Sequence, residues 1–197
     1  QPSPMGLGTD VHATMPYLLA DDFLCTESGP ITRITIWGSW WQDLLPEQGP
    51  TDVTFTLSIH ADIPAEQSGT GYSMPGELLW LKTFDIGEFE TVEFATQIEE
   101  GWMDPPAAYT FPGDWTCWQY KFHVDPHLVQ LAALLDHDPV VGADALHPHQ
   151  HGFHLVISGV TNGHRLCITG ARLLEQEAIP QRPRCFFDGH TLAFGVA

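Results

Sequence analysis

The sequence predicts an all-β fold, an antiparallel β-sandwich with one short helix near residues 126–136. Three observations indicate it: strict alternation of apolar and polar residues in two segments, further short apolar segments between Gly, Pro and Asp clusters, and a composition rich enough in apolar residues for a packed core. Sixteen prolines and eighteen glycines are spread through the connections, and no linker or repeat divides the chain. We therefore expect a single domain spanning residues 1–197.

Two segments carry the clearest strand pattern. In VTFTLSIH, apolar residues occupy every second position from Val53 to Ile59, and in CWQYKFHV they do so from Trp118 to Val124. A strand with one buried and one solvated face has this period of two. Further strands are expected at residues 31–37, 78–84, 90–96, 153–158, 164–169 and 191–196.

One segment departs from the strand pattern. After Asp125 and Pro126, which suit the cap and first position of a helix, apolar residues recur at helical spacing from Leu128 to Leu135. The sequence thus predicts a short helix near residues 126–136.

The charge of the chain excludes several classes of partner. Seven Lys and Arg residues against 25 Asp and Glu residues give a formal net charge of −18, which repels nucleic-acid phosphates and anionic lipid headgroups. No apolar run approaches the roughly 20 residues of a membrane-spanning helix, so membrane insertion is not expected. The chain begins at Gln1 without Met or a leader, so we expect a mature, secreted or cell-surface protein.

The four cysteines are an even, dispersed set. Cys25, Cys117, Cys167 and Cys185 contain no C-x-x-C pair, which disfavours a zinc ribbon or redox motif. In an exported chain two disulfides are expected, and three connectivities are open. The alternative is four reduced, buried thiols in a cytosolic protein.

The segment HPHQHGFH, residues 147–154, is rich in histidine. His147, His149 and His151 would point to one side of an extended backbone, where neutral imidazoles bind Zn²⁺ or Cu²⁺. Pro148 and Gly152 interrupt a ladder, so the other interpretation is an exposed loop that binds metal fortuitously.

Acidic residues suggest a calcium site without specifying one. Asp21 and Asp22 precede the first apolar strand residue, where carboxylates accept turn N–H bonds or, with other oxygens, hold calcium. No D-x-D-x-D-G loop fixes the ligands. Equally possible contributors are Asp10, Asp62, Glu99 and Glu100. The alternative is that these carboxylates are merely solvated.

The tryptophans raise the possibility of carbohydrate binding. Trp40 and Trp41 are adjacent, so one of them must point away from the core if a strand continues through them. Three others lie in apolar strand contexts and are expected in the core: Trp37, Trp80 and Trp118. No G-x-S-x-G or H-E-x-x-H signature occurs, and we do not expect an enzyme.

Part of the chain resembles a known family. The segments YLLADDFLCTESGPITRITIWGSW, VTFTLSIHADIPAEQSGTGYSMPGELLW and CWQYKFHV resemble exported bacterial β-sandwich domains of uncharacterised function, with an Ala-Asp-Asp-Phe opening, an I-x-I-W-G-S-W strand and a PG-x-L/V-L-W turn. The resemblance covers about residues 10–125, with TLAF near the end as a closing strand. Residues 136–190, including the histidine cluster, do not match.

The resemblance implies a secreted or surface location, a jelly-roll-like sandwich and no established catalytic residues. It also implies a disulfide between Cys25 and Cys117, which leaves Cys167 and Cys185 as the second pair. A loop of that spacing would contribute about 3 kcal/mol in the chain-entropy model.

Two functions remain. The first is a non-catalytic extracellular structural subunit that self-assembles into a filament, tube or layer through edge strands, including the apolar terminal segment HTLAFGVA. The alternative is an extracellular carbohydrate-binding or adhesion module whose partner is a glycan. Neither requires a cofactor, although bound calcium or zinc is compatible with both.

Overall fold

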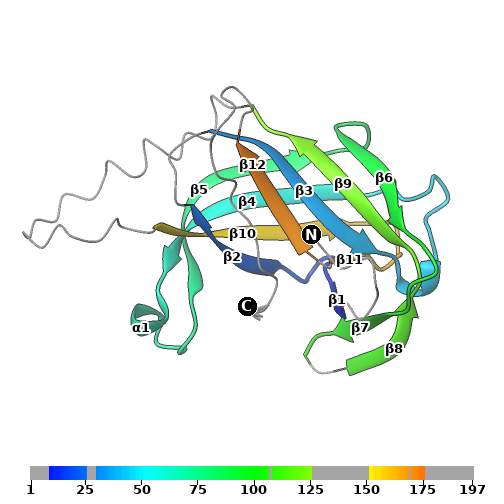
Figure 1. Cartoon of the computed structure of the whole chain (residues 1–197), viewed down its shortest axis with the longest axis horizontal. Coiled ribbons are helices and arrows are strands. Elements are labelled where there is room, and N and C mark those ends of the chain that lie inside the picture. The colour runs from blue at the N-terminus through cyan, green and yellow to red at the C-terminus, as the bar shows by residue number, and fades with distance from the viewer. Residues whose placement is uncertain (1–8, 26–29, 107, 126–150, 169, 176–197) are drawn as a thin grey trace, which may run out of the picture.

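A computed structural model describes residues 9–25, 30–106, 108–125, 151–168 and 170–175. These residues form an all-β sandwich, as predicted (Figure 1). The strands are β1 (Thr9–His12), β2 (Leu19–Cys25), β3 (Ile31–Ser39), β4 (Thr54–Ile63), β5 (Met74–Phe84), β6 (Phe89–Ala95), β7 (Glu100–Asp104), β8 (Ala108–Asp114), β9 (Cys117–His123), β10 (His151–Val160), β11 (Cys167–Ile168) and β12 (Gly170–Glu175). The short helices are η1 (Trp41–Asp43) and α1 (Ala65–Ser68).

The strands form three sheets of four. Their orders are β2-β10-β4-β5, β12-β3-β9-β6 and β11-β1-β7-β8. The first two stack face to face, and the third, smaller sheet lies at the end of the sandwich away from α1 (Figure 1). The named strands pair antiparallel in every ladder but one, because β1 pairs parallel with β7.

Aromatic side chains fill the space between the two large sheets. Phe55 of β4 lies with its ring centre 5.0 Å from that of Tyr120 and 5.2 Å from that of Phe122, both on β9. Phe84 of β5 approaches Phe122 to 4.9 Å. All four are fully buried, so the alternating residues of β4 and β9 form the centre of the core, as their pattern predicts.

Most predicted strands are confirmed, with one correction. Residues 31–37, 53–60, 78–84, 90–96, 117–124 and 153–158 lie within, or within one residue of, β3, β4, β5, β6, β9 and β10. The expected strand 164–169 is wrong in extent, since only Cys167–Ile168 forms β11. Residues 165 and 166 instead bond separately to residues near the ends of β1 and β3, so no single ladder forms there.

Several predictions fall outside the described residues. They are the helix near 126–136 and the strand at 191–196.

Trp37 and Trp80 are buried as expected, and Trp118 packs partly buried against the core. Within the part of the chain that the structure describes, no helix has the length and apolar character to cross a membrane.

The third sheet joins the sandwich through a close backbone approach at Gly38. A Cβ atom on Gly38 of β3 would lie 2.2 Å from the carbonyl oxygen of Cys167 in β11 and 3.2 Å from Ile168 Cδ1. The carbonyl oxygen belongs to the backbone, so it cannot move away by a change of side-chain rotamer. Only glycine therefore allows β3 and β11 to meet in this way.

We predict that Gly38→Ala lowers the free energy of unfolding by about 1 to 3 kcal/mol or more, the range of overpacking in a tight site. Gly159→Ala is the matched control, because its nearest neighbour is the movable Leu166 Cδ2 at 3.0 Å. Urea denaturation of both variants measures the difference. Equal stability of the two variants would contradict the close approach.

Candidate metal centre

The third sheet turns an acidic face away from the hydrophobic core. Val11 of β1 belongs to the core and Met103 of β7 packs against it. Neighbouring positions on a strand point to opposite faces, so Asp10 and Glu100 lie on the other side. Glu100 pairs directly with Asp114 at the end of β8, which brings a third carboxyl group to the same face.

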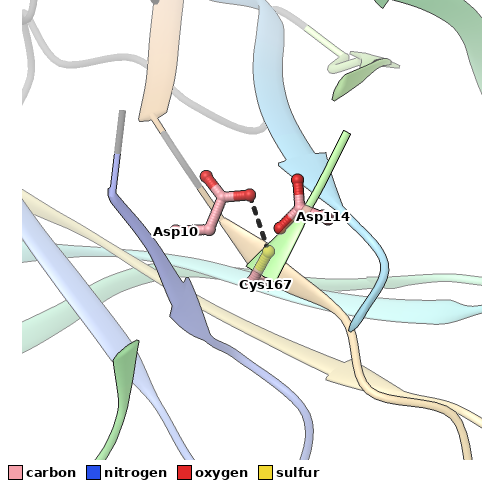
Figure 2. A group of neighbouring side chains, drawn as sticks. All are labelled: Asp10, Asp114 and Cys167. Carbon is pink, nitrogen blue, oxygen red and sulfur yellow. Dashed lines mark hydrogen bonds between the residues drawn. The ribbon is translucent and has the colours of Figure 1, made fainter. Parts of the chain in front are cut away.

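A thiol completes this group. Cys167 Sγ of β11 lies 3.0 Å from Asp10 Oδ2 and 3.2 Å from the backbone oxygen of Ser39, each within reach of the thiol proton. Figure 2 shows Asp10 and Asp114 converging on this sulfur from two other strands. One ligand atom from each of these three residues lies within 4.8 Å of the others.

All five residues are removed from water. Asp10, Asp114, Cys167 and Ser39 are 0% exposed and Glu100 is 1% exposed. We call these five residues the acidic cluster. Burying an ionised carboxylate without compensation costs several kcal/mol at least, so charge in the cluster must be neutralised.

Several oxygens of the acidic cluster have no regular hydrogen-bond partner. They are both carboxylate oxygens of Asp114, Oε2 of Glu100 and Oγ of Ser39. Ser39 Oγ lies near enough to Glu100 and Asp114 to lower their pKa values somewhat, without a bond of regular geometry to either. Within the described residues, no Lys or Arg forms an ion pair with Glu100 or Asp114.

Without a cation, the acidic groups of the cluster have raised pKa values. Burial raises the pKa of Glu100 to about 8, and the nearby Asp10 adds to the effect. Burial likewise raises the pKa of Asp114 to about 9, with further contributions from Asp10 and Glu100. Burial also holds the pKa of the Cys167 thiol well above its usual value. The metal-free cluster therefore retains protons at neutral pH, and a bound cation would displace them.

A second polar network lies on the same sheet. Arg165 Nη1 donates to Asp104 Oδ2 at 3.0 Å, and Asp104 Oδ1 lies 2.9 Å from His12 Nδ1. The Arg165 guanidinium is 6.0 Å from the centre of the Trp41 ring. In this partly exposed network the positive charge of Arg165 pairs with the negative charge of Asp104. Both carboxylate oxygens of Asp104 have a partner, unlike those of Asp114.

The predicted carbohydrate-binding tryptophans differ in position. Trp40 is 0% exposed and donates from Nε1 to Tyr120 Oη at 3.0 Å, so it belongs to the core. Trp41 is half-buried and meets Trp102 edge to face at 4.9 Å. Of the pair, only Trp41 offers surface to a ligand.

Asp21 and Asp22 do not come together. Asp21 of β2 lies opposite the core residue Leu155 and is half-buried, whereas Asp22 lies opposite His154 on the other face and is exposed. Burial, and then repulsion from Asp22, raises the pKa of Asp21 to about 7. Two carboxylates on opposite faces of a strand cannot share one ion.

The other predicted site residues are only partly described. His147 and His149 lie outside the described residues, as does the side chain of His151. Of the possible calcium contributors, Asp10 and Glu100 do lie in the acidic cluster. Glu99 is exposed, and Asp62 instead pairs with His154, with Oδ1 2.8 Å from Nε2.

The predicted disulfides are not supported among the described residues. Cys117 and Cys167 are buried, and the described part of the chain contains no disulfide bond. The side chain of Cys25 and the whole of Cys185 lie outside the described residues, so the two pairings stay predictions.

Sequence reasoning missed Asp114, Ser39 and the role of Cys167. The available signal was the period of two around residues 100–104, where Glu100, Trp102 and Asp104 alternate with Gly101 and Met103. This pattern places acidic residues on one face of a strand. It does not say which distant strands supply the rest.

The comparisons with known proteins give one match. Residues 1–133 match the model of the DUF7901 family, described as a domain of unknown function, and the chain belongs to that family. Neither the curated proteins nor the solved structures contain a match to this chain.

We predict a pH-dependent stability from Asp21. Its pKa is raised from 3.8 when unfolded to about 7 when folded, so the folded state binds the proton more tightly, and stability falls as the pH rises between these values. Asp21→Asn removes this loss. It should stabilise the protein at about pH 8 by on the order of 1–2 kcal/mol, after allowance for partial exposure, but not at about pH 3.

Chemical denaturation at both pH values measures this difference. Asp22→Asn is the comparison, because it removes only the smaller, repulsive contribution to the raised pKa of Asp21. A constant difference between Asp21→Asn and the parent protein at both pH values would contradict the buried placement of Asp21.

Proposed function

We propose that this member of the DUF7901 family is a non-catalytic, extracellular structural domain whose acidic cluster binds a divalent cation. The observation that carries the proposal is the full burial of three carboxyl groups, of which Glu100 and Asp114 have oxygens without a hydrogen-bond partner and no paired Lys or Arg among the described residues. Carboxylate oxygens in this state are ready ligands, and a cation would supply the missing positive charge.

The cation would act as a cross-link. The acidic cluster draws on β1, β3, the consecutive strands β7 and β8, and β11, so it joins four separate parts of the sequence. These strands join the third sheet to the sandwich where Gly38 and Cys167 meet. Binding there would stabilise the folded state by an amount that grows with the free cation concentration, about 2.7 kcal/mol at 100 times Kd.

We predict that adding Zn²⁺ or Ca²⁺ to chelator-treated protein raises its Tm, and that Glu100→Gln reduces this rise. Gln resembles the protonated carboxyl, so the metal-free variant should keep its stability. In the cation-bound protein, loss of the carboxyl group that hydrogen-bonds beside the ligands should weaken cation binding about 10-fold or more.

Glu99→Gln is the matched control, since Glu99 is exposed and adjacent to Glu100, on the other face of the strand. Calorimetric unfolding and titration calorimetry give the two readouts. No response to either cation, or the same response in Glu100→Gln as in the parent, would contradict the proposal.

The geometry also favours assembly of the domain through β8. In the described residues β8 is the last strand of its sheet, and its residues 108–111 are all exposed. Tyr109 is 54% exposed and Phe111 is 49% exposed. An edge strand with exposed aromatic side chains supports pairing with a second copy. The acidic cluster would hold this strand in place, because Asp114 ends it.

The carbohydrate-binding alternative rests on Trp41. Its half-buried ring lies beside the guanidinium of Arg165, which in turn donates to Asp104, so an aromatic surface and hydrogen-bonding groups occur together. This combination suits a sugar ring. We favour assembly because the Arg165 guanidinium already lies over the ring of Trp41.

We predict that Phe111→Lys shifts the protein from oligomers toward monomers at high concentration, because a buried lysine in an edge contact would be desolvated without a partner. Ile86→Lys is the matched control, as Ile86 is 51% exposed in the turn between β5 and β6. Light scattering with size-exclusion chromatography measures the mass. A parent protein that stays monomeric, or equal masses for both variants, would count against assembly and leave glycan binding as the better proposal.

A further inference from the structure

We infer that the cation is a thiophilic divalent transition ion of the zinc class, bound by Asp10, Asp114 and the thiolate of Cys167. This inference rests on the proposed function and names the metal that the acidic cluster selects. The three residues come from three strands, β1, β8 and β11, and their ligand atoms converge within 4.8 Å (Figure 2).

The spacing of the donors suits a small ion with few ligands. With Zn–S near 2.3 Å and Zn–O near 2.0 Å, tetrahedral geometry requires donors roughly 3 to 4 Å apart. Cys167 Sγ already lies 3.0 Å from Asp10 Oδ2, to which the thiol donates a hydrogen bond. Replacing that proton by the metal would separate the two donors only slightly.

The sulfur distinguishes this site from a calcium site. Ca²⁺ takes six to eight oxygen ligands, whereas thiolate ligands select zinc and related ions. A thiol between the carboxylates would take the position of an oxygen ligand, although sulfur is a poor ligand for Ca²⁺. For a zinc-class ion the same thiol becomes a strong ligand once its proton is released to solvent.

Ser39 provides an independent observation that points to a ligand. Its Oγ is fully buried and unpartnered, although it lies near both Glu100 and Asp114. Its backbone oxygen lies 3.2 Å from Cys167 Sγ. A residue that directs two oxygens toward the cluster is suited to complete a four-coordinate shell. Glu100 would then remain beside the shell and accept or donate a hydrogen bond.

A divalent ion would remove most of the negative charge of the proposed centre. Two carboxylates and one thiolate carry three negative charges, which a divalent ion reduces to one. In the absence of the ion, the same groups must keep protons to remain buried. The ion thus replaces protons, and the folded shape of the cluster can stay the same.

Ligation and disulfide formation exclude each other at Cys167. The metal ligand is the thiolate, and a sulfur in a disulfide bond is no longer a thiolate. The disulfide to Cys185, which is expected as the pair left over after Cys25 and Cys117, is therefore incompatible with a metal at this site. This conflict makes the inference testable in two independent ways.

The test is titration of the reduced, metal-free full chain with Co²⁺, a spectroscopic substitute for Zn²⁺. We expect a sulfur-to-cobalt charge-transfer band in the near ultraviolet, which added Zn²⁺ abolishes by displacement. Cys167→Ser should lose this band. Cys117→Ser is the matched control and should keep it, because Cys117 lies outside the group of three converging residues.

The outcomes separate this inference from the proposed function. Cobalt binding without the band, or with a band that survives Cys167→Ser, would overturn the inference and leave a cation site made of carboxylates. No binding of cobalt, zinc or calcium would overturn both. Peptide mapping that finds Cys167 joined to Cys185 in native protein would also overturn the inference.

A second measurement avoids dependence on a variant that fails to fold. Cadmium NMR of the parent protein reports sulfur ligation from the chemical shift alone. We expect the resonance of an ion with one sulfur and several oxygen ligands. A resonance typical of oxygen ligands only would contradict a thiolate ligand.

Discussion

The neutralisation of buried negative charge is the constraint on which this end of the molecule depends. Three carboxyl groups and a thiol lie at 0–1% exposure where the third sheet meets the sandwich. In water each carboxyl would lose its proton, but here burial raises the pKa of Glu100 and Asp114 to about 8 and about 9. Only protons or a cation can make this junction stable.

The junction explains the arrangement of the surrounding strands. Gly38 lets β3 approach the backbone of Cys167, and Ser39 then faces the carboxyl groups. The parallel pairing of β1 with β7 places Asp10 beside Trp102, two residues from the level of Glu100. The aromatic centre of the core lies between β4, β5 and β9, whereas the third sheet contributes core residues such as Val11 and Ile168 at one end. The cluster therefore governs how the third sheet is attached rather than whether the sandwich forms.

Much of the sandwich could be predicted from the sequence, because alternation is a local signal. Val53 to Ile59 and Trp118 to Val124 show the period of two, and the structure places these segments in or beside β4 and β9. The short strands β1, β7 and β11 carry too few residues for a period to be recognised. The pairing of β1 with β7 joins segments about ninety residues apart, and that of β1 with β11 joins segments more than 150 residues apart, which no local pattern reveals.

The acidic cluster was harder to predict for the same reason. Asp10 and Glu100 could be proposed as oxygen ligands from composition, but Asp114, Ser39 and Cys167 come from separate strands without a characteristic spacing. Residues that are adjacent in the sequence instead suggested a site at Asp21 and Asp22. Asp21 and Asp22 are adjacent in sequence, and this adjacency places them on opposite faces of β2.

The most direct test of a cation in the acidic cluster is a crystal structure of the protein grown with Zn²⁺, with diffraction recorded on both sides of the zinc absorption edge. An anomalous difference peak between Asp10, Asp114 and Cys167, at ligand distances near 2.0 Å for oxygen and 2.3 Å for sulfur, is the predicted result. An ordered cluster with no peak there, whose carboxyl groups share protons through short hydrogen bonds, would contradict it.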